Sequence, residues 1–363
     1  MDSFAFIIHP IDAKRDVSRK FPFWGRVFSE RQIDFLSRFF PPIYLSEIEG
    51  ITSESTGKEI KGWLIACPYT PRRMLSLPEK TVYRKIIQTG HLAEKLGADI
   101  LGLGAFTSVV GDGGITIARS LEVPVTTGDS YTIAIAVEAI REAAKKMGIS
   151  LPNATAAVVG ANGAIGRVCA ELLADDVGRL LLIGRNAESL EALQANLAPS
   201  SRAELVTSTT MDMLTEAELI LTVTSAVYTD VVKPEHLRPG SVVCDVARPR
   251  DVSAMVAAAR DDILVIDGGM VDIPGLVDFH FDFGFPPGKA YACMAETMAL
   301  ALEGRMEDYT LGKRITRSRV DEIAMIAKKH GFRLSGFRSF EKEVTPEQIE
   351  AVRRSARKNV KRH

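Results

Sequence analysis

The stretch Thr155-Ala-Ala-Val-Val-Gly-Ala-Asn-Gly-Ala-Ile-Gly166 decides the fold of this chain. Its apolar, β-prone half stops at Gly160, and a glycine turn then opens into a helical pattern. Glycines allow a tight turn and let the backbone approach a pyrophosphate, which then lies at the N-terminus of the helix. The layout predicts a dinucleotide-binding βαβ unit. Its turn supplies six candidate cofactor contacts: Gly160, Asn162, Gly163, Ala164, Ile165 and Gly166.

The end of the next apolar run, 180–183, indicates which dinucleotide binds. The corresponding strand of NAD enzymes usually ends in Asp or Glu, which binds the ribose 2′-OH, whereas this chain has Arg185 followed by Asn186. An arginine suits the 2′-phosphate, so we predict NADPH. Because the glycines are spaced G-x-x-G-x-x-G rather than G-x-G-x-x-G, a turn without a ligand is the alternative. The ends of two later strands add candidate contacts: Thr224, Ser225, Gly268 and Gly269.

Apolar runs and helical patterns alternate along most of the 363 residues, which is typical of α/β proteins. The fold class we predict is α/β: a Rossmann-type doubly wound parallel sheet with an N-terminal α/β substrate domain and C-terminal helices. The expected domains are 1–150, 151–285 and 286–363. The expected strands are 63–67, 99–103, 122–126, 155–159, 180–183, 219–223, 241–246 and 263–266, and the expected helices are 79–96, 131–147, 294–303 and 318–330.

Bulk composition is that of a globular protein. The hydrophobic fraction is 46%, the charged fraction 25% and the net charge −1, which gives no support for nucleic-acid binding. The N-terminus has no signal-peptide pattern, and the longest uncharged run, 151–166, is shorter than the ~18 residues of a membrane-spanning helix. Four cysteines without a C-x-x-C pair argue against disulfides and zinc, and we expect no catalytic metal. A reducing cytoplasm is the expected location.

Cys293 is the candidate nucleophile. It follows a proline–glycine turn and precedes an apolar helix, so it should lie in the first turn of that helix, where exposed N–H groups and the helix dipole favour a thiolate. Lys289, four residues earlier, would add positive charge. A thiolate combined with NADPH fits a two-step reduction, in which Cys293 accepts an acyl group as a thioester and hydride then releases an aldehyde.

Other interpretations of the cysteines stay open. In one interpretation, Cys293 is a small residue that packs the helix and has no catalytic role. In another, Cys67 is the nucleophile, because it ends a predicted strand and could face a cleft. Cys169 and Cys244 are expected in the core. His280 lies among phenylalanines, and we interpret it as a core residue rather than an acid.

Residues 5–335 resemble the long-chain fatty acyl-[acyl-carrier-protein] reductases, which supply aldehydes for alkane biosynthesis. Six motifs in order carry the resemblance: LGAFTSVV (103–110), TTGDSYT (126–132), VGANGAIG (159–166), IGRN (183–186), DGGM (267–270) and YACMAETM (291–298). The resemblance implies an N-terminal acyl-binding domain, a central NADPH domain and Cys293 as the acyl-accepting nucleophile. It implies reduction of a fatty acyl-[acyl-carrier-protein], or acyl-CoA, to an aldehyde, with an aldehyde-consuming enzyme as a further partner. The aromatic segment 277–285 and the charged extension after 335 depart from the pattern.

The sequence also suggests residues that would bind the acyl substrate and residues that would dock its carrier protein. The turn after the predicted strand 99–103 is a candidate acyl site, or else a plain tight turn, with four residues: Gly104, Phe106, Thr107 and Ser108. Acyl carrier proteins are acidic, so a basic patch should dock them. The candidate patch, with a solvated helix face as its alternative, is Arg72, Arg73, Lys80, Arg84 and Lys85. The basic end of the chain is expected to be a solvated helix or frayed tail: Arg353, Arg354, Arg357, Lys358, Lys361 and Arg362.

Two other resemblances compete. Segments 102–112 and 245–251 are similar to glutamyl-tRNA reductase, which also reduces an acyl-cysteine, but this chain lacks a long dimerisation helix and an evident tRNA-binding patch. The alternative function is that of an NADP-dependent shikimate or quinate dehydrogenase, whose NADP half looks similar. Such enzymes use a lysine within N-x-T-x-P-x-K, and no such segment occurs before residue 150.

Overall fold

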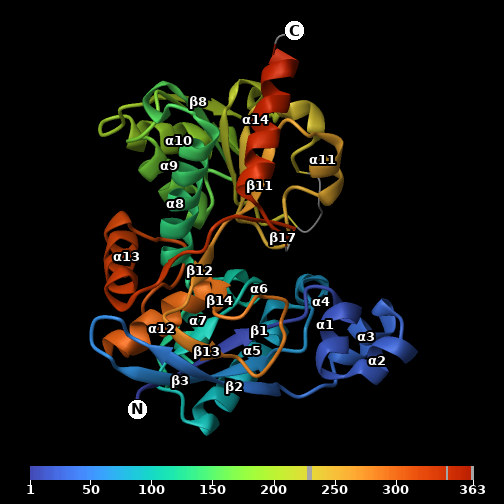
Figure 1. Ribbon diagram of the computed structural model, residues 1–363. Helices are drawn as coiled ribbons and strands as arrows, with labels where there is room; N and C mark the ends of the chain where they lie inside the picture. Colours follow the sequence, from blue (N-terminus) through green and yellow to red (C-terminus); the bar gives the residue numbers. More distant parts are fainter. Residues whose placement is uncertain (227–230, 341, 361–363) are drawn as a thin grey trace. The chain divides into compact units, whose positions relative to one another are not determined.

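The computed structural model describes residues 1–226, 231–340 and 342–360 (Figure 1). The chain forms two compact units, and each is assembled from segments that lie far apart in the sequence. Unit 1 consists of Met1–Tyr131, Val271–Ile315 and Arg319–Arg333, and unit 2 of Thr132–Met270, Thr316–Ser318 and Leu334–His363. Each unit contains a six-stranded sheet.

Unit 2 has the predicted Rossmann fold. Its strands lie in the order β8-β7-β6-β9-β10-β11, all neighbours are parallel, and the order reverses between β6 and β9. Ligands of such sheets bind beyond the carboxyl ends of the strands at this switch point. The strands are β6 (Thr155–Val159), β7 (Arg179–Ile183), β8 (Glu204–Ser208), β9 (Leu219–Thr222), β10 (Val242–Asp245) and β11 (Leu264–Asp267). The helices are α8 (Asp129–Met147), α9 (Ala164–Leu173), α10 (Ala187–Leu197), α11 (Ala254–Ala259) and α14 (Pro346–Val360), with 3₁₀ turns at Leu151–Asn153, Asp212–Glu216 and Pro234–His236.

Unit 1 has a mixed sheet in the order β13-β2-β3-β1-β4-β5, in which β2 is antiparallel to both of its neighbours. Both faces are covered. Ile7 of β1 packs in one core with Val82 and Ile86 of α5, whereas α12 packs on the other face, where Phe6 lies. The strands are β1 (Ser3–Ile8), β2 (Ile43–Thr52), β3 (Glu59–Ala66), β4 (Leu101–Leu103), β5 (Val125–Thr126) and β13 (Gly275–Asp278). The helices are α1 (Ala13–Lys20), α2 (Pro22–Val27), α3 (Glu30–Ser37), α4 (Pro71–Ser76), α5 (Glu79–Leu96), α6 (Phe106–Val109), α7 (Ile115–Ala118), α12 (Ala292–Glu303) and α13 (Arg317–His330). Short strands complete the chain: β12 (Met270–Asp272), β14 (Lys289–Tyr291), β15 (Arg333–Leu334), β16 (Arg338–Ser339) and β17 (Lys342–Glu343).

Most predicted elements are confirmed in type. α5 spans the predicted helix 79–96 and ends at Gly97, which has the left-handed conformation (φ 85°). The basic end forms α14, which is anchored rather than frayed, because Ile349 and Ala356 are buried and Asn359 donates a hydrogen bond to Asp262 (2.9 Å). Lys361 and Arg362 lie outside the described residues. Sequence reasoning missed β1 and β2, the edge strand β8, the helices α1 to α3 and several short elements, among them α4, α6, α7 and β13.

The two units cross the predicted ranges 1–150, 151–285 and 286–363. Residues 271–315 belong with the N-terminal segment, because β13 extends the sheet at β2 and α12 packs on β1 and β4. Cys293, which was expected in a separate C-terminal region, therefore belongs to the same unit as the predicted acyl-binding turn.

Candidate active site

The glycine turn after β6 forms a cradle of backbone atoms at the switch point of unit 2. Gly160 has φ 89°, and a Cβ on Gly166 would lie 2.1 Å from the carbonyl oxygen of Gly160. Gly163 is the N-cap residue of α9 and has no side chain to cover the N–H groups of the first turn. Those N–H groups lack partners within the helix, and they suit a pyrophosphate. The turn therefore fits a dinucleotide.

Arg185 lies beyond the end of β7, the strand beside β6. Its side chain is exposed, and it forms no ion pair or hydrogen bond with the described residues. The side chain of the adjacent Asn186 caps α10, where it accepts a hydrogen bond from the N–H of Ser189 (2.8 Å). The guanidinium of Arg185 is thus available to a phosphate, whereas the side chain of Asn186 serves the helix.

The later cofactor candidates differ from one another in their surroundings. Thr224 donates both its N–H and its hydroxyl to the buried Asp251, so its hydroxyl is already used. Burial raises the pKa of Asp251 to about 6. Ser225 is exposed. Gly268 is buried against Val246, and Gly269 has φ 90° with open space around it.

Cys293 is the second residue of α12, as predicted, and the segment before α8 packs against it. Gly128 has φ 75°, and a Cβ there would lie 2.3 Å from the Cα of Cys293, so only glycine permits this approach. The backbone N–H groups of Met294 and Ala105 lie near enough to the sulfur to lower the pKa of the thiol. Ala105 itself has a positive φ of 47°, which is rare for a residue with a side chain. The predicted nucleophile and the predicted acyl-binding turn are thus brought together.

The expectation of a thiolate at Cys293 is wrong for this structure. Burial, followed by the nearby Asp129 carboxyl, raises the pKa of Cys293 to about 12, although the N–H groups of Met294 and Ala105 oppose the shift. Lys289 does not offset these effects, because its ammonium pairs with Asp272 (2.7 Å). The sulfur therefore carries its proton at neutral pH.

Sequence reasoning missed two carboxyl groups near Cys293, those of the half-buried Asp129 and the buried Glu296. Burial, and then the charge of Glu296, raises the pKa of Asp129 to about 7. Burial also raises the pKa of Glu296, which accepts hydrogen bonds from Thr126 Oγ1, Thr310 Oγ1 (2.8 Å) and the N–H of Tyr131 (2.8 Å). Glu296 is the one charged residue in 290–302, and a lone charge in an apolar helix is the signal that would have found it.

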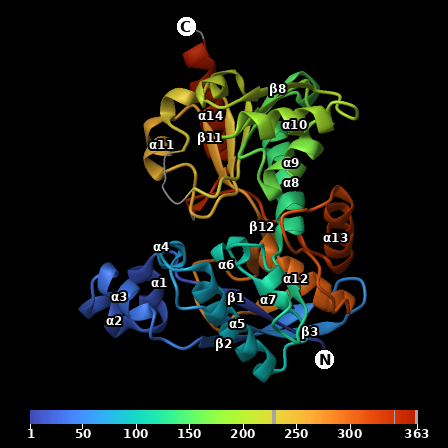
Figure 2. The same ribbon diagram turned by 180° about the vertical axis from the view of Figure 1, so that it is seen from behind.

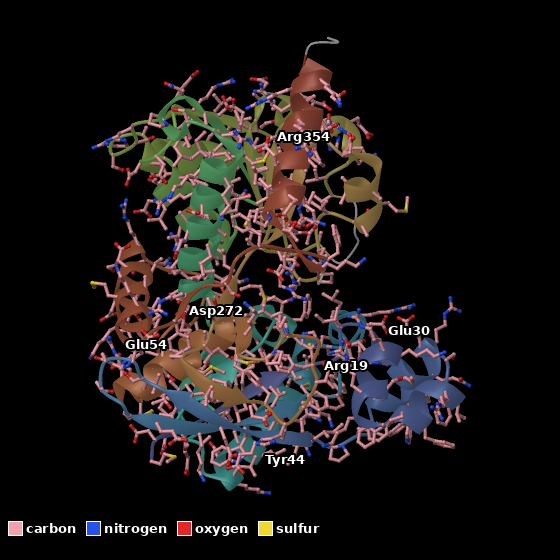
Figure 3. The ribbon with its side chains drawn as sticks, in the orientation of Figure 1. Arg19, Glu30, Tyr44, Glu54, Asp272 and Arg354 are labelled. Atoms are coloured by element: carbon pink, nitrogen blue, oxygen red, sulfur yellow. The ribbon has the colours of Figure 1, made fainter. Side chains whose placement is uncertain are left out.

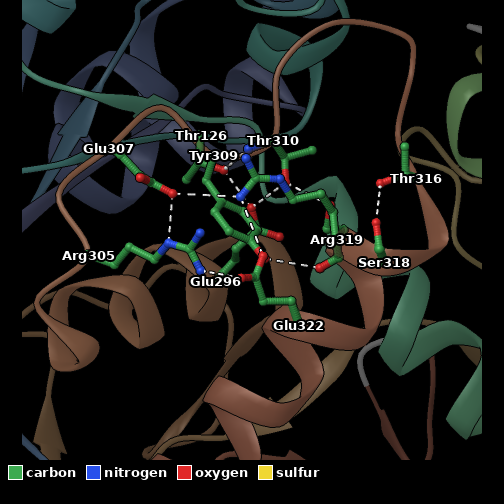
Figure 4. Close-up of polar contacts among 11 residues, drawn as sticks. Thr126, Glu296, Arg305, Glu307, Tyr309, Thr310, Thr316, Ser318, Arg319 and Glu322 are labelled. Atoms are coloured by element: carbon green, nitrogen blue, oxygen red, sulfur yellow. Dashed lines mark hydrogen bonds and ion pairs between the residues drawn. The ribbon is translucent and has the colours of Figure 1, made fainter.

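A network of ion pairs holds the segment that carries Thr310 (Figure 4). Arg305 pairs with Glu307 (2.7 Å) and with Glu322 of α13 (2.5 Å). The hydroxyl of Tyr309 donates to Glu322 (2.9 Å), so the residue before Thr310 is fixed. This network places the hydroxyl of Thr310 on Glu296.

The pKa of Cys293 depends on Asp129, and this dependence can be tested. We expect Asp129→Asn to make alkylation of Cys293 by iodoacetamide faster, by roughly tenfold for each pKa unit that the thiol loses. The carboxyl of Asp129 ionises near pH 7, so the difference from the unmodified protein should be small below pH 7 and should grow above it. Alkylation is followed by mass spectrometry across pH. The matched control is Asp278→Asn, which removes an exposed charge; equal profiles for all three proteins would show that Asp129 does not act on the thiol.

The turn with the predicted acyl-binding residues is held by its own hydrogen bonds. The hydroxyls of Thr107 and Ser108 donate to the carbonyls of Gly104 (2.8 Å) and Ala105 (2.7 Å). His9 accepts the N–H of Phe106 at Nε2 (2.9 Å), and burial lowers the pKa of His9 to about 4, so it stays neutral in this role. These hydrogen bonds hold the turn in place, and Ala105 is the residue of the turn that lies near the thiol of Cys293.

The other cysteines are all core residues. Cys67, Cys169 and Cys244 are fully buried, and burial raises their pKa values, to about 11 for Cys67 and about 12 for Cys169. The prediction for Cys169 and Cys244 is confirmed, whereas Cys67 does not face a cleft. Cys293 is half-buried.

The described part of the chain holds no group of three or more His, Cys, Asp and Glu residues that could bind a metal ion.

Two surface predictions need correction. His280 is exposed rather than part of the core, because it follows the edge strand β13 and pairs with Glu49 (3.2 Å). Two residues of the predicted basic patch are bound within unit 1 and are not available to a partner. Arg73 pairs with Asp34 (2.7 Å), and Lys85 donates a hydrogen bond to the carbonyl of Phe40 (2.9 Å). Arg72, Lys80 and Arg84 remain exposed.

Within the described ranges, no helix has the length and apolar character that crossing a membrane requires.

Comparisons with known proteins found one family model and several solved structures that are similar to this chain. The model of the shikimate / quinate 5-dehydrogenase family matches residues 141–267, which contain all six strands of the Rossmann sheet. A solved structure, L-tryptophan dehydrogenase from Nostoc punctiforme, is similar over 100% of this chain and 89% of its own, with 11% identity and a TM-score of 0.41.

Two curated relatives match most of the chain. Aminotransferase PigE from Serratia sp. is 33% identical over 84% of this chain, which spans only 36% of that protein. The long-chain acyl-[acyl-carrier-protein] reductase from Synechococcus elongatus is 32% identical over 89% of this chain and 95% of its own length. With its Rossmann unit and nicotinamide cofactor, the protein is an NAD(P)-dependent oxidoreductase. The chain belongs to the long-chain acyl-[acyl-carrier-protein] reductase family.

Proposed function

We propose that the protein reduces a long-chain fatty acyl-[acyl-carrier-protein], or acyl-CoA, to the fatty aldehyde with NADPH, through a thioester on Cys293. The position of Cys293 carries the proposal: it is the one cysteine of four that is not fully buried, and it lies in the first turn of α12, beside the turn that contains Ala105. The relative from Synechococcus elongatus supports the substrate class, and the reducing cytoplasm suits a free thiol.

Two steps account for all atoms. In the first, the sulfur of Cys293 attacks the acyl carbonyl, the bond to the carrier sulfur breaks, and the Cys293 proton ends on the departing carrier thiol. The N–H groups of Met294 and Ala105 stabilise the sulfur while it is negative. In the second, the thioester carbon accepts hydride, its bond to Cys293 breaks, and the aldehyde leaves while the sulfur takes a proton from solvent.

NADPH, when bound, supplies the hydride. The residues of unit 2 that would hold it are the glycines of the turn after β6, which leave room for the pyrophosphate, and Arg185, whose free guanidinium would pair with the 2′-phosphate. Unit 1 would thus bind the acyl group and unit 2 would bind NADPH, so turnover requires both units.

An aromatic series that ends beside Cys293 supports a long acyl chain as the substrate. The ring centroids of Phe279 and Phe283 are 4.8 Å apart, those of Phe283 and Phe285 4.8 Å, and those of Phe285 and Tyr291 4.6 Å. Tyr291 is the N-cap residue of α12, and it is half-buried like Phe283 and Phe285. An alkyl chain on Cys293 would remove the open ring surface from water. The turn with Gly104, Phe106, Thr107 and Ser108 would form the wall around the carbonyl.

The test is incubation with an acyl-[acyl-carrier-protein] without NADPH, followed by intact mass measurement. We expect one acyl adduct, which is absent from Cys293→Ala and retained in Cys67→Ala. An adduct that is lost only in Cys67→Ala would identify Cys67, rather than Cys293, as the nucleophile. The match to the shikimate / quinate 5-dehydrogenase model favours a second candidate, a polyol dehydrogenase; no adduct, together with NADP-linked oxidation of shikimate or quinate, would support it.

A further inference from the structure

The three helices α1 to α3, with the residues that join and follow them (residues 13–40), carry an unusual number of exposed apolar side chains. We call this segment the aromatic lobe. Phe23 and Phe39 keep 69% and 66% of their surface exposed, and Val27 and Phe35 keep 55% and 48%. The rings of Phe35 and Phe39 are neighbours, with centroids 6.1 Å apart, and exposed apolar side chains that gather on a surface mark sites of interaction. The lobe extends past the end of the sheet of unit 1 in both ribbon views (Figures 1 and 2).

The exposed rings are not left over from an incomplete core. The lobe has a separate set of inner rings, in which Trp24 contacts Phe28 and Phe40 at centroid distances of 5.0 and 5.1 Å. α3 is fixed at its start by a capping box between Ser29 and Gln32. It is fixed to the rest of unit 1 by the ion pair of Asp34 with Arg73. The lobe is therefore folded and anchored, and its outer phenylalanines are surplus to its stability.

The aromatic lobe carries an excess of positive charge, and one of its arginines lies against two of the exposed rings. Residues 12–40 contain seven Lys and Arg against four Asp and Glu, although the whole chain has a net charge of −1. The guanidinium of Arg38 lies 4.2 Å from the ring centre of Phe35 and 4.3 Å from that of Phe39. Asp34 is paired with Arg73 outside the lobe, whereas Asp16 lies 3.3 Å from Arg15 and is balanced within it. The side chains of the lobe, with Arg19 and Glu30 labelled, are drawn in Figure 3.

We propose that the aromatic lobe docks the protein onto the surface of an anionic phospholipid membrane. Exposed rings that reach the boundary of headgroups and acyl chains, beside arginines that stay among the phosphates, are the arrangement of an interfacial membrane anchor. Each basic residue near an anionic surface adds attraction that salt screens.

A lipid surface fits these residues better than an acidic protein does. An acidic partner would pair with the arginines, but protruding rings gain affinity from a protein only where it has pockets that receive them. A fluid interface accepts single rings without preformed pockets. The inference is independent of the proposed reaction, because neither substrate nor cofactor enters it.

The experiment is sedimentation of the full chain with vesicles of phosphatidylcholine, and with vesicles of phosphatidylcholine mixed with phosphatidylglycerol. We expect binding to the mixed vesicles that weakens as salt rises, and little binding to phosphatidylcholine alone. The double variant Phe23→Ser, Phe39→Ser should lose at least about tenfold in partition coefficient, because two rings no longer leave water. Both side chains are exposed, so folding should be unaffected, and circular dichroism checks this.

The matched control is Met325→Ser on α13, which removes an apolar side chain that is 66% exposed outside the aromatic lobe. It should bind vesicles like the unmodified chain. Equal binding of the double variant, or no binding of the unmodified chain to mixed vesicles, would overturn the proposal. Loss of binding to a purified acyl carrier protein in the double variant, with vesicle binding unchanged, would assign the lobe to that acidic protein instead.

Discussion

Replacing Cys293 with serine should abolish aldehyde formation while NADPH binding is retained. The hydroxyl of serine is a far weaker nucleophile than a thiol, and the two carboxyl groups nearby, Asp129 and Glu296, oppose any negative charge at this position. Loss of a covalent nucleophile lowers turnover by at least about a thousandfold. NADPH affinity should stay within about twofold, because the substitution leaves unchanged the glycine turn and Arg185, which would hold the pyrophosphate and the 2′-phosphate. Aldehyde is measured by gas chromatography, and NADPH binding by fluorescence.

Two controls make this result specific. Thermal unfolding should show similar stability for Cys293→Ser, since the substitution exchanges sulfur for oxygen in a half-buried side chain. Cys169→Ser places the same change in the core, where burial of an unpaired hydroxyl should lower stability while the remaining folded protein keeps its activity per molecule. Substantial aldehyde formation by folded Cys293→Ser would exclude the thioester mechanism. It would leave direct hydride transfer to the bound acyl group.

The Rossmann unit could be predicted because its signals are local. The glycine turn after β6 and the apolar runs of five of its six strands are each contained in a few residues, and the strand order follows from the rules for such sheets. The missed strand, β8 (Glu204–Ser208), lies at the edge of the sheet and is only partly buried, so its sequence has no continuous apolar run. Edge strands carry the weakest pattern.

The candidate site could be predicted only in part, because its residues come together through tertiary structure. Cys293 and the turn at 104–108 could each be selected from the sequence. Their contact depends on the packing of α12 across β1 and β4, which no local pattern shows. The same packing brings Asp129 to the thiol, and it reverses the expected effect of the helix N-terminus on the pKa of Cys293. Burial and like charges outweigh the helix dipole here.

Replacing Arg185 with aspartate should change the cofactor preference. The exposed guanidinium, free of partners among the described residues, is replaced by a carboxylate that repels the 2′-phosphate of NADPH and can accept a hydrogen bond from the 2′-OH of NADH. A charge-assisted hydrogen bond contributes about 1.5–3 kcal/mol, which corresponds to roughly 10- to 150-fold in affinity, and repulsion adds to the loss. We expect the Kd of NADPH to rise by about a hundredfold and that of NADH to change by less than about threefold.

The comparison of the two nucleotides is what identifies the role of Arg185. Both share the pyrophosphate that the glycine turn would hold, so damage to the turn weakens both equally, whereas loss of a 2′-phosphate contact weakens only NADPH. Arg202→Asp makes the same charge change at a residue outside the turn and outside the carboxyl ends of β6 and β7, and it should leave both affinities unchanged. Equal losses for NADPH and NADH in Arg185→Asp would mean that Arg185 does not contact the 2′-phosphate. The preference for NADPH would then have to come from another cation near the carboxyl end of β7.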